Sequence, residues 1–578
     1  MQRGLFRWVY LLLAGLAASF ALPDFAAARP REQTIRNISI EVREMFDDPD
    51  IGTFYRAANG LKISTKEEVV RRELLFNTGD KYDEFVLEES ERALRALSFI
   101  RQVSITPIPD GEFVDILVSV QDTWTIFPQL GFSSGGGTQK LEIGLLEKNL
   151  LGWGKSVELA YLDDEGRETF RGIWDDRRVF GTYHRFTFGQ LLRADGYRTV
   201  SLFGRPFRSL LDTSSWSASV DASDLVHRLF ANASERYIFR DKAQDISARY
   251  VISRGDPEKL LHRYSGGYAY INDDFTVADE QDFEDANVSP CCVSNDPSML
   301  PEDRRFSGPF FVYDRIVPDF ISINYIDRFE RIEDYNLGNV TSLRAQVAPE
   351  IFGSYDDTLL VTASSRQGLA FSPTAFLRGE LGAASRLDND GFENTILRGE
   401  MRYYNVLGNI LPQFFVGKHT LAVNLQMDYG NDLDLDREFL LGAANGLRGY
   451  KDRTFTGDKR VVLNLEDRFH IAEDVLRLFS LGGVVFTDVG GSTFDSYGTL
   501  FGDEMYSDIG FGLRIGVPRT AGGGVVRFDI AFPLRDGPDG SEQFNPRFFI
   551  TTGQLFSSLL RSETVGAERA NVTLGEAD

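Results

Sequence analysis

The 578-residue sequence is poor in cysteine, in basic side chains and in long apolar segments. Its 62 lysines and arginines stand against 86 aspartates and glutamates, a formal net charge of −24. A nucleic-acid partner is excluded, because phosphate binding needs a basic surface. The two cysteines, Cys291 and Cys292, are neighbours, so they form neither a disulfide framework nor a metal site. A vicinal bridge, a link to another chain and, most simply, two thiols in a solvated loop are the open interpretations of this pair.

One uncharged apolar segment lies at the N-terminus. Arg3 and Arg7 precede an apolar run over residues 8–22, and three alanines follow at 26–28. This pattern predicts a cleaved secretory signal peptide over residues 1–28. A retained anchor is the weaker alternative, because a spanning helix needs about 20 apolar residues. No later segment approaches that length, so the mature chain can cross a membrane only as a β-barrel.

Residue types that carry enzyme chemistry lack productive spacing. Asp432, Asp434 and Asp436 suggest a calcium loop, but the turn glycine and terminal glutamate of an EF-hand are missing. Neither a nucleophile elbow nor a phosphate-binding loop occurs. We therefore predict that the chain is not an enzyme and has no cofactor, metal or catalytic residue. The histidines are scattered, without metal-ligand spacing: His184, His227, His262, His419 and His470.

Residues 33–122 have the pattern of a small α+β domain of order β-α-α-β-β. An alternating strand near 34–43 is followed by a helix over 66–76, which a capping box at Thr65 opens. A second helix begins at Asp83, and two alternating strands close the unit.

This order resembles a POTRA domain of the outer-membrane assembly-factor superfamily, which includes BamA, TamA and the bacterial surface antigens. Such a domain exposes a sheet edge, and an extended client can add to that edge through main-chain hydrogen bonds. A simple spacer at the mouth of a barrel is the alternative. The residues that carry the resemblance are Gly79, Asp80, Tyr82, Phe99 and Val103.

Residues 123–556 form a long series of amphipathic strands. Charged residues recur on one face of strand after strand, and the packed core of a soluble sandwich could not absorb them all. Long acidic connections such as 273–308 suit the outer loops of a barrel. The fold class predicted here is therefore a membrane β-barrel, with about sixteen antiparallel strands out of roughly sixteen to twenty candidates. One example alternates Leu421, Val423, Leu425 and Met427 with Ala422, Asn424, Gln426 and Asp428.

Four motifs in order resemble the signature of the same superfamily. The tip Gly446-Leu447-Arg448-Gly449-Tyr450 is similar to the Arg-Gly-aromatic tip of the long loop that folds back inside these barrels. It is preceded by Asn149–Gly154 and followed by Asn464-Leu465-Glu466 and by Phe486-Thr487-Asp488-Val489-Gly490. The resemblance covers residues 33–556.

The cost of burying a charged side chain in a barrel lumen predicts a partner for Arg448. An unpaired guanidinium in the lumen is costly, whereas carboxylates can hold it in a bidentate way. Glu466 shares its strand face with Asn464 and should point inward, so we expect Arg448 to reach Glu466 or Asp488 and pin the loop to the wall. Asp488 has the same parity as Phe486, so one of these two should lie at a strand end or bulge. A solvated loop-tip charge is the alternative for Arg448.

The last predicted strand, residues 547–556, resembles the terminal insertion signal of outer-membrane barrels. Phe548, Ile550 and Phe556 share one face, and Gly553 stands where the family has glycine. A polar tail, residues 557–578, follows, although these barrels usually stop at the aromatic residue. We expect this strand to form a seam with the first one, near 124–133, which Pro128 and Gly131 weaken.

The resemblance implies an outer-membrane protein assembly factor that captures client strands and templates them at the seam. Its partners would be unfolded outer-membrane proteins or a secreted client, outer-membrane lipid, and periplasmic chaperones or lipoproteins. The small domain and the C-terminal tail would lie in the periplasm. A two-partner-secretion translocase and an accessory barrel with a lipid-export or structural role are the alternatives.

Overall fold

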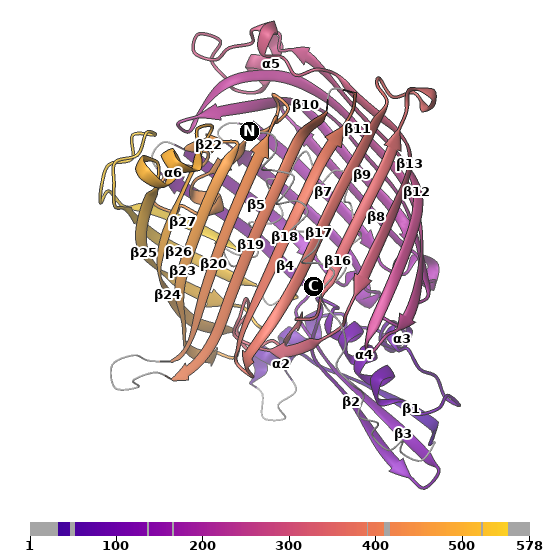
Figure 1. Ribbon diagram of the computed structural model, residues 1–578. Helices are drawn as coiled ribbons and strands as arrows, with labels where there is room; N and C mark the ends of the chain where they lie inside the picture. Colours follow the sequence, from indigo (N-terminus) through magenta and orange to yellow (C-terminus); the bar gives the residue numbers. More distant parts are fainter. Residues whose placement is uncertain are drawn as a thin grey trace.

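The computed structural model shows a wide barrel with a small domain at one end (Figure 1). The structure describes residues 33–46, 52–135, 138–164, 167–389, 391–409, 417–521 and 524–552. The predicted signal peptide and polar tail lie outside these residues. Within them, the helices are all too short or too polar to cross a membrane.

The small domain packs helices on a three-stranded sheet of order β1-β3-β2, in which β1 runs parallel to β3. The alternating apolar residues of β3, such as Ile116 and Val118, are buried against Leu94 and Phe99. The strands are β1 (Thr34–Arg43), β2 (Ile100–Asp110) and β3 (Phe113–Asp122), and the helices are α2 (Thr53–Leu61), α3 (Glu67–Glu73) and α4 (Glu84–Arg95).

The prediction of two helices in this domain was wrong, because α2 occupies what the sequence suggested was a polar connection. Contacts with the segment just before it hold α2, since the Asn59 amide donates to Phe46 O (2.8 Å) and the Tyr55 ring packs on Phe46. The capping box was also wrong: Thr65 bonds the Asp122 carboxylate through its N–H and hydroxyl. Asp83 does cap α4, accepting from Phe85 N at 3.0 Å.

The barrel is a closed antiparallel wall, which confirms the predicted fold class, but among the described residues it has twenty strands and not sixteen. The count of twenty lies at the upper end of the candidates in the sequence, and polar or glycine residues interrupt the outer face of some strands in the first half. Gly172 and Gln190, for example, share faces with the exposed Phe170 and Leu192. The wall strands of this half are β4 (Ile126–Gly135), β5 (Thr138–Glu147), β6 (Lys155–Asp164), β7 (Arg167–Asp176), β8 (Arg185–Arg193), β9 (Gly196–Arg205), β10 (Ser214–Ala231), β11 (Ser234–Asp256), β12 (Leu260–Val277) and β13 (Arg304–Ile316).

The second half of the wall carries the predicted signature motifs. Its strands are β16 (Val340–Ala348), β17 (Thr358–Ser372), β18 (Ala375–Leu387), β19 (Phe392–Asn409), β20 (Lys418–Asn431), β23 (Lys459–Val475), β24 (Phe479–Thr493), β25 (Tyr506–Gly516), β26 (Val525–Pro533) and β27 (Arg547–Thr552). Two hairpins lie off the wall, β14 (Phe320–Ile323) with β15 (Glu333–Asn336) and β21 (Phe439–Leu441) with β22 (Phe455–Gly457). Short helices α5 (Glu280–Asp285) and α6 (Tyr497–Asp503) lie in loops.

Apolar side chains face outward and charged ones inward. Ile143 and Leu159 are 50% and 60% exposed, whereas Glu466 and Arg468 are each 1% exposed. This is the alternation of a barrel that meets lipid outside and encloses a polar lumen.

The small domain docks on the loops at one end of the barrel, here called the near end; the opposite end is the far end (Figure 1). The predicted motif at 149–154 is one of these docking loops. Asn149 donates to the Thr65 hydroxyl (2.7 Å), and Lys66 N donates to Gly152 O (3.1 Å). A Cβ on Gly152, which has a φ of +76°, would collide with Ser64 O, so this close approach requires glycine.

Candidate functional site: an arginine-held loop and a strand seam

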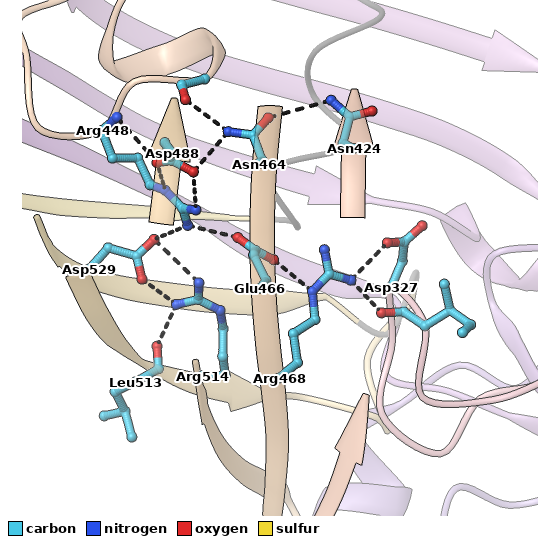
Figure 2. Close-up of polar contacts among 12 residues, drawn as sticks. Asp327, Asn424, Arg448, Asn464, Glu466, Arg468, Asp488, Leu513, Arg514 and Asp529 are labelled. Carbon is cyan, nitrogen blue, oxygen red and sulfur yellow. Dashed lines mark hydrogen bonds and ion pairs between the residues drawn. The ribbon is translucent and has the colours of Figure 1, made fainter. Parts of the chain in front are cut away.

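The far-end loop between β20 and β23 folds back into the lumen. Its β21–β22 hairpin brings Gly446–Tyr450 against the inner face of β23, β24 and β25 (Figure 2). We call residues 432–458 the inturned loop.

Arg448 ends among carboxylates from two neighbouring strands. Its Nε and Nη2 donate to the two oxygens of Asp488 at 2.7 and 2.8 Å, and its Nη1 donates to Glu466 Oε1 at 2.7 Å. All three side chains are at most 3% exposed. The structure therefore brings the predicted arginine to both predicted partners, in the bidentate geometry that favours a buried guanidinium. We call this group the arginine clamp.

Phe486 also belongs to this site, although the alternation of the sequence did not predict that it faces the lumen. We expected a strand end or bulge between Phe486 and Asp488, but the register of β24 is continuous there and both side chains face the lumen. The Phe486 ring lies under the guanidinium, 3.4 Å from Arg448 Cζ, in a cation–π contact. Gly510 on the next strand has no side chain in the space of that ring.

Gly449 and Tyr450 extend the contact to β25 and the β26–β27 loop. Gly449 N donates to Asp508 Oδ2 at 2.8 Å, and the Tyr450 hydroxyl reaches Arg535 O at 2.9 Å. A Cβ on Gly449 would lie 2.6 Å from Asp508 Cβ and 3.0 Å from Pro533 N, so only glycine fits at this position.

A polar network spreads from the clamp along the inner wall, as Figure 2 shows. Asn464 joins the loop to the wall, donating to both Gly446 O and Asp488 Oδ1 at 2.8 Å. Glu466 is shared, because its second oxygen accepts from Arg468 Nε at 2.8 Å. Sequence reasoning placed Asn464 and Glu466 on the inner face by alternation. It gave no signal for Asp508 or for the Arg514–Asp529 pair beside the clamp, because these residues lie on β25 and β26, outside the four motifs.

The barrel closes between β4 and β27, where the seam was predicted. Within the described residues, which end at Thr552 in β27, this pair shares the register positions Phe548↔Ser134, Phe549↔Ser133 and Ile550↔Phe132. Phe548 points outward and is 54% exposed. Pro128 and Gly131 lie in β4 on the near side of these pairs. Gly553 and Phe556 fall outside the described residues.

The predicted POTRA residues have structural positions in the small domain. Gly79 takes a φ of +96° in the turn before α4, and the Asp80 carboxylate accepts from Asn77 N at 2.7 Å. Phe99 is buried in the core, with Tyr82 and Val103 packed against it. These residues shape the fold of the domain.

Two ionisable sites lie outside the barrel wall. Lys62 follows α2 and pairs with the buried Asp122, and burial lowers the pKa of its ammonium group. Cys291 and Cys292 are exposed free thiols in the far-end loop after α5, with their Sγ atoms 2.8 Å apart.

The chain is thus a closed β-barrel with an inturned loop clamped inside it and a small domain docked at one end. Residues 356–556 match the Omp85 superfamily domain, and residues 58–122 match a POTRA domain described as a surface antigen variable number repeat. The chain therefore combines an Omp85 domain with a POTRA domain, which confirms the resemblance to the BamA/TamA superfamily.

Individual relatives are more distant. The outer membrane protein assembly factor BamA of Nitratidesulfovibrio vulgaris is 29% identical over 136 residues, which cover 22% of this chain and 16% of that protein. Among solved structures, BamA from Haemophilus ducreyi lacking POTRA domains 1–3 shares 12% identity, with a TM-score of 0.36 over 90% of this chain and 84% of that one. CdiB from Acinetobacter baumannii shares 12% identity, with a TM-score of 0.46 over 90% and 74%.

Proposed function

We propose that this protein is an outer-membrane factor that inserts client β-strands at the seam between β4 and β27, with its POTRA domain in the periplasm. The observation that carries the proposal is that the first and last wall strands, β4 and β27, are neighbours and close the barrel. An unpaired strand edge in lipid costs several kcal/mol for each unsatisfied group, so a parted seam binds any strand that can supply hydrogen bonds.

The POTRA domain supplies the first binding surface in this proposal. In its sheet order, β2 is an edge strand, so the main-chain groups on its outer side are open to an extended segment. Ile108 on this strand is 51% exposed and offers an apolar contact. The partners would be unfolded outer-membrane proteins, delivered with or without periplasmic chaperones or lipoproteins.

The alternatives are a two-partner-secretion translocase, which would thread one client through the lumen, and an accessory barrel in lipid export or structure. Threading would require the inturned loop to leave the lumen, which means breaking the buried clamp of Arg448. Insertion at the seam leaves that clamp in place, so the geometry favours insertion.

A reversible cross-link across the seam tests this proposal. The variant carries F549C and S133C, which are register partners, in a C291S/C292S background. Oxidised protein in liposomes should lose most of its ability to fold an added client barrel, and reduction should restore it. The matched control carries I515C and V526C, register partners within the wall, and should stay active when oxidised. Full activity of the oxidised seam variant, with cross-linking complete, would contradict insertion at this seam.

A further inference from the structure

A 23-residue segment at the near end, residues 317–339, joins β13 to β16 and carries the β14–β15 hairpin. Its ends are adjacent, since Val317 N donates to Asn339 O at 2.7 Å, so a tight turn could have made the same connection. We call this segment the insert.

The insert packs inside the lumen on one side. Ile323, Ile326 and Leu337 form a buried cluster with three inward residues of the wall, Phe376, Tyr404 and Ala422. Ala422 is fully buried although it lies on the luminal face of β20. The insert therefore covers an apolar patch on the inner wall.

The wall is shaped to receive one ring of the insert. A Cβ on Gly516 would collide with the Phe329 ring, and one on Gly482 would lie 3.2 Å from it. Phe329 also meets the His470 ring edge-on, with centroids 4.8 Å apart. Two glycines on neighbouring strands thus form a seat for this aromatic side chain.

On its other side the insert is held by the C-terminal end of α4 and the start of β2. Arg95 donates twice to Asp334, at 2.8 and 3.0 Å, and Arg101 donates to Glu330 at 2.6 Å. Arg331 is 6% exposed and donates to the carbonyls that follow α4, those of Arg95, Leu97 and Ser98. The POTRA domain therefore grips the segment that covers the luminal patch.

Arg468 joins the insert to the arginine clamp (Figure 2). Its Nη1 donates to Ile326 O at 2.7 Å, and its Nε donates to Glu466, which also accepts from Arg448. A continuous chain of buried polar contacts thus runs from the inturned loop to the POTRA-held insert.

We propose that the insert is a removable plug of the near end of the lumen, released when its grip by the POTRA domain is broken, and that Arg468 couples its release to the inturned loop. The plug and the loop share one carboxylate, Glu466, so displacing either changes the charge balance that holds the other. This inference concerns the closure of the lumen and does not depend on which client the protein handles.

Labelling of a cysteine beneath the plug tests the proposal in the full-length protein in liposomes. In the C291S/C292S background, A422C should react slowly with a membrane-impermeant maleimide. Reversal of the gripping charges, R95E with R101E, should raise the labelling rate at least about tenfold, because two attractive contacts become repulsive. Adding D334R and E330R restores opposite charges and should return the rate to its starting value.

Two further variants keep the test decisive if the POTRA domain that carries R95E and R101E misfolds. R71E is the matched control, because Arg71 pairs with Glu67 on the exposed side of the POTRA domain. Its labelling rate should not change. G516A should expel Phe329 and raise the rate without touching the POTRA domain. Rapid labelling of A422C in the otherwise unaltered protein, or equal rates in all variants, would overturn the plug.

Reciprocity tests the coupling through Arg468. R448Q should raise the rate at A422C, and R95E with R101E should raise the rate at A443C, a buried position in the inturned loop, by a similar factor. Both effects should disappear in R468M, which keeps the bulk of the side chain without its donors. Release of the plug with no change at position 443 would overturn the coupling.

Discussion

At the scale of single residues, Arg448 is the group on which the inturned loop depends. Replacing it by alanine leaves Asp488 buried without a counter-ion and Glu466 with Arg468 alone, and breaking such a buried pair typically costs about 3–5 kcal/mol. The barrel itself should still fold, because the wall hydrogen bonds do not involve this side chain. We expect R448A to retain the heat-modifiable mobility of a folded barrel in electrophoresis and to lose client insertion.

Lysine at the same position separates charge from geometry. R448K keeps a positive charge but cannot make the bidentate contact with Asp488 and loses the stacking of a planar group on Phe486. Its activity should fall between those of R448A and the unaltered protein. Full activity of R448A would show that the clamp has no functional role.

Gly449 tests the close approach of the loop to the wall. G449A places a methyl group against Asp508 and the Pro533 backbone, and such overpacking costs about 1–3 kcal/mol. The loop should loosen, so protease cleavage within residues 432–458 should become faster. G502A is the control, because that glycine in α6 has open space where its Cβ would lie. Equal cleavage of the two variants would argue against a tight fit at Gly449.

At the scale of elements, strand alternation predicted which face a side chain occupies better than it predicted what that side chain contacts. Alternation along β23 placed Glu466 inward, because every second side chain of a strand points to the same face and Glu466 shares the face of Asn464. Parity failed at Phe486 because it treats an aromatic residue as lipid-facing, whereas this ring supports a guanidinium. It also said nothing of residues 317–339, whose role depends on β20, β23 and α4 and not on its own pattern.

The β14–β15 hairpin should respond to pH. Burial, and then the nearby Asp327 carboxylate, raise the pKa of Glu333 to about 7 from its usual 4.5, against the opposing effects of Arg328 and of hydrogen bonds from the N–H groups of residues 327 and 328. The folded hairpin therefore binds more protons than the unfolded one between these values, so the contribution of Glu333 to its stability is fully present below pH 4.5 and is lost as pH rises through 7.

Labelling of A422C should accordingly be slower at pH 6 than at pH 8. The intrinsic pH dependence of the thiol is removed by dividing each rate by that of E112C, an exposed site on the β2–β3 turn of the POTRA domain. In E333Q the corrected rates at the two pH values should be equal. A corrected rate that falls as pH rises would contradict the assignment.

At the scale of the whole molecule, the charge balance matches the distribution of charge in the fold. The excess of acidic side chains excluded nucleic acid as a partner, and many of the arginines pair with carboxylates inside the barrel, as in the clamp. The number of strands could not be predicted in the same way. The pairing of the first strand with the last one was predicted, but strand boundaries slip in a single sequence, so the number of strands between them was not fixed.

The broadest prediction concerns the outer-membrane proteome of cells depleted of this protein. A seam that pairs with any strand through its main chain has little demand on client sequence, so many different barrels should decline together while inner-membrane proteins stay constant. Complementation by the unaltered chain should restore them, and R448A should not. Loss of one secreted protein with an unchanged set of barrels would instead support a translocase. An unchanged proteome would contradict both, because a factor that either inserts or exports proteins must alter what reaches the membrane.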